Sequence, residues 1–143
     1  MNDLQKALAI LDERFGKDSP IALATVEDGI PSVRTVNSLC LDGSFYIITD
    51  ARSRKMRQLR KNPIAAVCGD WFTGQGTGEN LGWIGNPDNA ALAARLREAF
   101  ASWYQNGHVD ESDPNTVILR IRLTKGTLAS HGEWYHIEFP KKP

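Results

Sequence analysis

Two Asp-Gly dipeptides divide a β-rich stretch of the chain, and they constrain its fold more than any other feature. The stretch covers residues 21–50 and reads IALATVEDGIPSVRTVNSLCLDGSFYIITD, in which β-branched and aromatic residues predominate. Asp28-Gly29 and Asp42-Gly43 interrupt it. Asp-Gly between such runs is the strongest short-range signal for a tight hairpin turn. We therefore expect three consecutive antiparallel strands.

Helices are expected before and after these strands. Residues 2–16 carry apolar side chains at helical spacing, with Asn2 or Asp3 as the cap and Gly16 at the end. Residues 52–62 form a shorter amphipathic pattern that begins near Ser53 and is stopped by Asn62-Pro63. Asn86-Pro87 opens a third pattern, which we expect to run as one long helix to Gly107.

The remaining segments read as strands. Residues 64–68 resume an extended apolar run, and the glycine-rich residues 74–85 are expected to form a strand with bulges or bends. Residues 116–139 are expected to give three final strands. So many strands usually close into a barrel, because closure removes exposed edges. We predict a mainly β protein with inserted helices, an antiparallel barrel, and a single domain over residues 1–143.

Composition excludes several classes of function. The formal net charge is zero, whereas a general nucleic-acid binder shows a basic excess, so no nucleic-acid partner is expected. The amphipathic N-terminus is unlike a signal peptide, and no apolar run approaches the length of a membrane span, so we expect a cytoplasmic protein without a membrane partner. Cys40 and Cys68 lie in apolar stretches and are expected to be buried and reduced.

A basic run marks the most informative segment of the chain. Residues 52–61 contain six cationic side chains and no acid. Three of them lie at the expected helix start, where the helix dipole is already positive and makes unpaired cations unfavourable. Free N–H groups, the Ser53 hydroxyl and converging cations together make an anion site, for which phosphate is the usual occupant. The alternative is a solvated basic face, which is what charge runs usually form.

Arg34 adds a cation to the neighbouring expected strand. An arginine within a barrel wall is either exposed or paired with an anionic group. A salt bridge with Asp50 or Glu27 is one alternative, and contact with an anionic ligand is the other. His108, His131 and His136 lack a spacing typical of metal ligands, so no metal site is predicted, and no catalytic acid, base or nucleophile can be named.

Residues 20–63 resemble the FMN-binding split barrel of the pyridoxamine 5′-phosphate oxidase superfamily. The resemblance rests on motifs that follow one another in the same order and at similar spacing. They are Leu23-Ala24-Thr25, Gly29-x-Pro31-x-x-Arg34-x-Val36, Tyr46-Ile47-Ile48-Thr49, Ser53-Arg54-Lys55 and Asn62-Pro63. The resemblance implies a split β-barrel of the FMN-binding type that forms a homodimer, with FMN in a groove between the protomers.

The resemblance also implies roles for particular residues. Arg34, Ser53, Arg54 and Lys55 would hold the FMN phosphate. Thr35, Val36, Asn37 and Ser38 would line the isoalloxazine, while Ile48 and Thr49 would lie near the ring or the ribityl chain. Gln75 is the candidate for a further flavin contact from the next strand.

The C-terminal segment departs from the oxidases themselves. Those enzymes end in a tryptophan-containing strand with an Arg-Leu pair, whereas residues 132–140 read GEWYHIEFP and no arginine follows His131. Oxidation of pyridoxamine phosphate is therefore not expected, and the ending looks more like the small bacterial members of the superfamily. The resemblance implies flavin-dependent redox chemistry on a small molecule, with NAD(P)H or oxygen as partner. The alternatives are a non-catalytic flavin-binding stress or sensor protein, or a member that binds a deazaflavin or haem.

Overall fold

A computed structural model describes residues 2–106 and 109–141 of the chain. The order of elements agrees with the sequence prediction through residue 83. The helices are α1 (Asp3–Phe15), α2 (Arg54–Lys61), the 3₁₀ turn η1 (Pro87–Asn89), α3 (Ala90–Ala99) and α4 (Ala101–Tyr104). The strands are β1 (Ser19–Glu27), β2 (Ile30–Leu41), β3 (Ser44–Asp50), β4 (Ile64–Gly69), β5 (Phe72–Trp83), β6 (Thr116–Ser130) and β7 (Glu133–Glu138).

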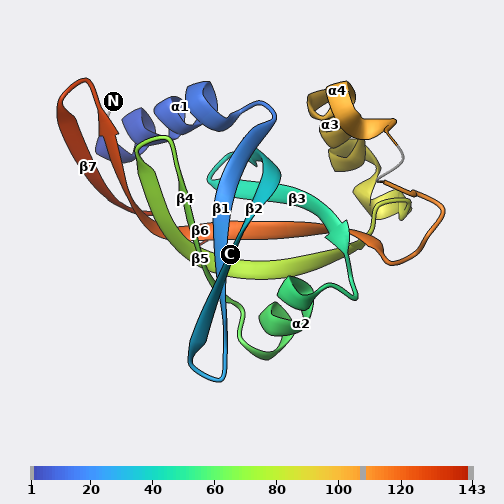
Figure 1. The fold of residues 1–143 in the computed structure, drawn as a ribbon. Helices are drawn as coiled ribbons and strands as arrows, with labels where there is room; N and C mark the ends of the chain where they lie inside the picture. The colour runs from blue at the N-terminus through green and yellow to red at the C-terminus, as the bar shows by residue number, and fades with distance from the viewer. Residues whose placement is uncertain (1, 107–108, 142–143) are drawn as a thin grey trace.

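The strands form one antiparallel sheet that closes on itself (Figure 1). The order is β3-β2-β1-β4-β5-β6-β7, and an additional β3–β6 pairing joins the first strand to the sixth. The closed part is a six-stranded barrel, from which β7 extends beyond β6. Both Asp-Gly turns form as predicted, with positive φ at both residues: 54° and 77° at Asp28-Gly29, 48° and 79° at Asp42-Gly43. Such φ values are typical of two-residue hairpin turns.

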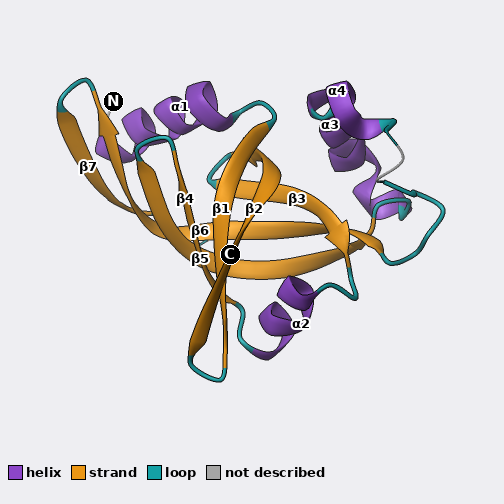
Figure 2. Cartoon of the chain, in the orientation of Figure 1, coloured by secondary structure: helices purple, strands orange, loops and turns teal. Residues whose placement is uncertain are grey.

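The interior of the barrel is the main hydrophobic core. Inward side chains of the strands join residues from α1 and α2, which lie at opposite ends of the barrel (Figure 2). α1 contributes Ala7, Leu11 and Phe15, and its N-terminus is fixed by a reciprocal capping box between Asn2 and Gln5. α2 contributes Met56 and Leu59. Helix burial therefore follows the apolar spacing that the sequence shows.

The glycine-rich strand β5 has the bends that were predicted, and its glycines accommodate protein groups. Register shifts against β6 lie between Gln75 and Gly76 and between Asn80 and Trp83. A Cβ at Gly76 would lie 2.2 Å from the Arg122 carbonyl oxygen, and one at Gly78 would lie 2.9 Å from a Leu59 methyl group. Glycine at position 78 thus lets α2 seat Leu59 against β5, which fixes the helix at this end of the barrel.

A second cluster lies between the outer surface of the sheet and the short helices α3 and α4. It includes Leu96, Phe100 and Ile118. The expected single helix over 86–107 is wrong, because Asn89 and Phe100 leave helical geometry and divide it. This break lets Trp103 stack on Phe100 at 4.9 Å between ring centroids and donate from Nε1 to Asp18 Oδ2 at 2.8 Å. Gly107, the expected helix end, lies outside the described residues.

Two further expectations need correction. Residues 116–139 give two strands, because β6 stays continuous through the register shift near Gln75 and pairs with β3, β5 and β7 in turn. Cys40 is buried, but Cys68 is exposed. Cys68 lies on the outer face of β4 with Ile64 and Ala66. The run is apolar because both faces of this strand carry apolar side chains, so its composition does not show which residues are buried. Among the described helices, none is long and apolar enough to cross a membrane.

Candidate functional site

Arg34 is held by uncharged acceptors where β1, β2 and α2 meet. Its Nη1 donates to the Leu23 carbonyl oxygen at 3.2 Å and to Thr25 Oγ1 at 2.8 Å. Its Nη2 donates to Gln58 Oε1 at 3.4 Å. No carboxylate of the described residues forms an ion pair with Arg34. The predicted alternative of a plain salt bridge is therefore wrong.

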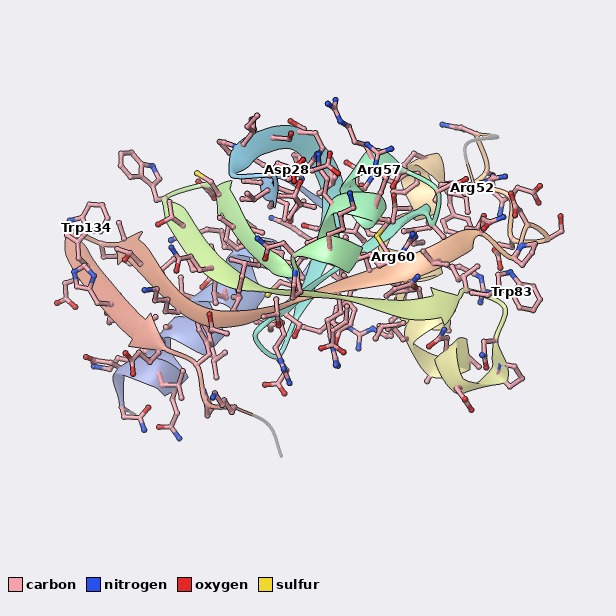
Figure 3. The ribbon with its side chains drawn as sticks, turned by 90° about the horizontal axis from the view of Figure 1, so that it is seen from below. Asp28, Arg52, Arg57, Arg60, Trp83 and Trp134 are labelled. Atoms are coloured by element: carbon pink, nitrogen blue, oxygen red, sulfur yellow. The ribbon has the colours of Figure 1, made fainter. Side chains whose placement is uncertain are left out.

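The carboxylates considered for that salt bridge contact other cations. Glu27 lies 3.8 Å from Arg57 Nη2 and 3.5 Å from Lys61 Nζ. Asp50 lies 2.9 Å from Arg52 Nη2, and Arg52 also reaches Asp113. Figure 3 shows the exposed cations Arg52, Arg57 and Arg60 around α2. Much of the basic run is thus neutralised locally, as the solvated-face alternative requires.

The beginning of α2 is different. Ser53 occupies the N-cap position with an extended backbone, but its side chain makes no capping hydrogen bond. The Ser53 Oγ atom is buried and has no hydrogen-bond partner. A buried hydroxyl without a partner is unfavourable unless a further group satisfies it. The helix start therefore presents an unused polar atom, together with unpaired backbone N–H groups.

Lys55 and Arg54 stand beside this hydroxyl without an ion-pair partner among the described residues. Burial lowers the pKa of Lys55, and the positive charge of Arg34 lowers it further. Burial likewise lowers the pKa of Arg34, and the charge of Arg54 adds to the effect. Arg34 is therefore repelled by both Arg54 and Lys55 at a partly desolvated place, while the charge of Asp50 offsets part of the effect at Lys55. A dianionic phosphate would offset this positive charge and would offer acceptors to Ser53 and the helix N–H groups.

A groove of about 760 Å³ lies on the outer face of the sheet. Strand register places its lining in two rows that cross several strands. One row runs Val33, Ala24, Ala66, Gln75, Lys125 and Glu138; the other runs Ala22, Cys68, Thr73, Thr127 and His136, with Thr35 beside Ala22 at its β2 end. The floor from β1 and β4 carries only small side chains, which suits a flat apolar group.

The comparisons with known proteins agree with this architecture. The family model described as pyridoxamine 5′-phosphate oxidase matches residues 11–129. The chain belongs to this family. A pyridoxine/pyridoxamine 5′-phosphate oxidase of Acidothermus cellulolyticus is 42% identical over 62 residues, which are 41% of this chain and 28% of that protein. The chain therefore matches less than a third of that relative's length.

Solved structures show the same fold at low sequence identity. General Stress Protein 26 from Bacillus anthracis has a TM-score of 0.69 at 17% identity, covering 95% of this chain and 100% of its own. A heme binding protein from Mycobacterium smegmatis has a TM-score of 0.69 at 16% identity, and the match covers 96% of this chain and 58% of that protein. A FAD-binding protein from Mesorhizobium loti has a TM-score of 0.57 at 20% identity, and the match covers 82% of this chain and 91% of that protein.

The family fold separates the predicted site residues into two places. Arg34, Ser53, Arg54 and Lys55 come together at the start of α2, whereas Gln75 lines the outer groove. Residues 34–38 alternate between faces. Thr35 and Asn37 are exposed, Val36 packs against the barrel core, and Ser38 is buried and donates to the Ser19 carbonyl oxygen at 2.9 Å.

Ile48 and Thr49 lie on opposite faces of β3. Ile48 packs against the cluster beneath α3, and Thr49 pairs with Val117 across the sheet. The flavin contacts assigned to these residues, to residues 35–38 and to Gln75 stay predictions. The described residues contain no group of three or more His, Cys, Asp or Glu that could hold a metal ion. His131 lies in the β6–β7 turn and His136 in β7, while His108 lies outside the described residues.

Sequence reasoning missed Thr25 and Gln58. Both side chains are buried, and the Thr25 hydroxyl donates to Gln58 Oε1 while it accepts from Arg34. The helical spacing gives no signal for Gln58, since it lies three and four residues after Lys55 and Arg54 and not on the face of Met56 and Leu59, although it is buried. A glutamine on a buried face needs a hydrogen-bond partner inside the protein. The partner could not be identified, because Thr25 is distant in sequence.

Proposed function

We propose that this chain is an FMN-binding flavoprotein that acts as an oxidoreductase on a small molecule. The observation that carries the proposal is the set of uncompensated donors at the start of α2. Arg34, Arg54 and Lys55 have no ion-pair partner among the described residues, and the buried Ser53 hydroxyl has no hydrogen-bond partner. The nearby cations Arg52, Arg57 and Lys61 do have carboxylate partners, and the exposed Arg60 at the far end of the helix reaches a backbone carbonyl oxygen. This contrast favours a bound phosphate over a diffuse basic face.

Different residues would bind the phosphate and the ring of FMN. Lys55 and Arg34 would neutralise the FMN phosphate, and Ser53 with the helix N–H groups would orient its oxygens. The small side chains of the groove floor would exclude water from a flat ring, with Gln75 as an amide hydrogen-bonding group at the edge. FMN supplies hydride transfer when it is bound, and the protein supplies orientation and electrostatics. NAD(P)H or oxygen would be the redox partner.

We propose that the working form is a homodimer. The outer face of the sheet exposes Val33 at 69% and Ile64 at 55%, beside the small apolar residues of the groove. Such a continuous apolar surface marks an interaction site. A second copy of the chain placed there would cover these residues and close the groove, which couples dimer formation to flavin binding.

The solved structures with the same fold bear on the alternative functions. The fold neighbours include a protein described as heme binding and one described as FAD-binding, so the type of prosthetic group needs direct identification. General Stress Protein 26 has the same fold, which is compatible with a non-catalytic role. A deazaflavin would use the same phosphate donors.

An absorbance spectrum of the purified protein, with mass identification of the released ligand, tests the proposal. We expect flavin bands and a mass equal to FMN. A haem spectrum, a deazaflavin mass or a colourless protein that does not bind added FMN would overturn it. Steady-state oxidation of NAD(P)H by the FMN-loaded protein then separates an oxidoreductase from a non-catalytic flavin binder, since only the former accelerates flavin reduction.

A further inference from the structure

We propose that Gln58 and Thr25 position Arg34 with acceptors that leave its positive charge available to an anionic ligand. The inference rests on the proposed function, because the anion is the FMN phosphate. Gln58 is 1% exposed and Thr25 is fully buried. They reach Arg34 from different elements, α2 and β1. One buried hydrogen-bond network therefore joins the arginine of β2 to the helix that carries Ser53 and Lys55.

The directions of the hydrogen bonds in this network are determined by chemistry. A guanidinium has donors only, so the Gln58 atom that faces Arg34 must be the amide oxygen. Thr25 Oγ1 accepts from Arg34 Nη1, and its own hydrogen goes to Gln58 Oε1. Thr25 can serve both partners only in this arrangement. The pair thus holds one edge of the guanidinium in a single orientation.

The opposite edge of Arg34 stays available. Both hydrogens of Nη1 are used by Leu23 and Thr25, and Nη2 uses one hydrogen on Gln58. Nε and the second hydrogen of Nη2 have no protein acceptor among the described residues. These parallel donors form the geometry that binds two oxygens of a phosphate at once.

A neutral acceptor at position 58 is what keeps the charge of the site positive. A carboxylate there would also orient Arg34, but it would neutralise the cation before any ligand arrived. Gln58 lies three residues after Lys55 and four after Arg54, so it shares their side of the helix. An acid at this position would therefore reduce the positive potential of all three cations, and an amide leaves that potential unchanged.

The substitution Gln58→Glu tests this role, because it conserves the shape and alters only the charge. Apoprotein is titrated with FMN and, separately, with riboflavin, which lacks the phosphate, and thermal unfolding of the apoprotein is measured. We expect FMN affinity to fall roughly tenfold to a hundredfold, the effect of losing a charge-assisted contact. Riboflavin affinity and the apoprotein unfolding temperature should not fall. A merely structural glutamine would weaken both ligands and lower the unfolding temperature.

Arg60→Gln is the matched control. It changes the net charge by the same amount on the same helix, but Arg60 is exposed and its side chain only reaches the Ala51 carbonyl oxygen at 3.5 Å. FMN affinity should be unchanged in this variant. A similar loss in both variants would show a diffuse charge effect and overturn the positioning role.

Thr25→Val is a second, independent variant that keeps a β-branched side chain in β1 and removes the hydroxyl. FMN affinity should fall by several-fold, since a hydrogen bond is lost, and riboflavin affinity should not change. Wild-type affinity for FMN in both Gln58→Glu and Thr25→Val would refute the inference and leave the phosphate site intact. If the unmodified protein binds riboflavin as tightly as FMN, the proposed phosphate site itself is wrong.

Discussion

Lys55→Ala is the most direct test of the phosphate site. Lys55 is half-buried, its pKa is lowered by burial and by Arg34, and it has no ion-pair partner among the described residues. Its ammonium group would make a charge-assisted hydrogen bond to the ligand, worth about 1.5–3 kcal/mol. FMN affinity should therefore fall roughly tenfold to a hundredfold. Replacement of Arg34 by alanine should have an effect of similar size.

Lys61→Ala is the matched control for this substitution. It removes the same charge from the last residue of α2, where Lys61 is exposed and paired with Glu27 at 3.5 Å. An exposed pair of this kind contributes about 0.2–1 kcal/mol to stability and nothing to a site at the other end of the helix. Fluorescence titration of apoprotein with FMN and riboflavin gives both affinities. Equal losses in Lys55→Ala and Lys61→Ala, or a loss of riboflavin affinity equal to that of FMN, would refute the reasoning.

The pH dependence of FMN binding gives a second measurement on the same residue. The pKa of Lys55 lies below its ordinary value of 10.5, so the ammonium loses its proton at a lower pH than a free lysine. Affinity that depends on this charge is present at neutral pH and is lost as the pH rises through the lowered pKa. The Lys55→Ala variant should lose this alkaline decrease. If both proteins show the same decrease, another group causes it.

Two further predictions concern the outer face of the sheet. Val33→Glu should convert a dimer into a monomer near 15.9 kDa in light scattering, because it places a charge on the exposed apolar surface. A wild-type protein that is monomeric with FMN present would contradict the proposed dimer. Cys68 should react rapidly with a thiol reagent in that monomeric variant and slowly in the dimer. Cys40 should react slowly in both, because burial raises its pKa to about 12. Mass spectrometry after timed labelling distinguishes the two sites.

Local chemistry explains why much of the fold could be predicted from the sequence. Asp28-Gly29 and Asp42-Gly43 set their turns through their own backbone preferences, and Asn2 caps α1 through a contact three residues away. The division of the third helix at Phe100 could not be predicted, because its cause is tertiary. Trp103 gains a ring contact and a hydrogen bond to Asp18, 85 residues away in sequence.

The candidate site was predictable in part for the same reason. The basic run and Ser53 are adjacent in sequence, so their convergence at a helix start follows from the helix itself. The sequence could not show which cations are neutralised, since Glu27 reaches Lys61 across 34 residues and Asp113 reaches Arg52 across 61. The prediction that Cys68 is buried is wrong for a different reason. The apolar run predicts burial, but the outer face of β4 is itself an apolar surface.

If the start of α2 binds phosphate as proposed, folding and anion binding are interdependent. Arg34 is repelled by both Arg54 and Lys55, and a bound anion would relieve that repulsion only in the folded state. A ligand at a hundred times its Kd adds about 2.7 kcal/mol to the free energy of unfolding. Inorganic phosphate should therefore raise the unfolding temperature of the apoprotein more than chloride does at equal ionic strength. The Lys55→Ala variant should lose the difference between the two salts while its unfolding temperature in chloride is not lowered. Equal stabilisation by both salts in the unmodified protein would show that the cations are merely screened, and that the helix start does not bind phosphate.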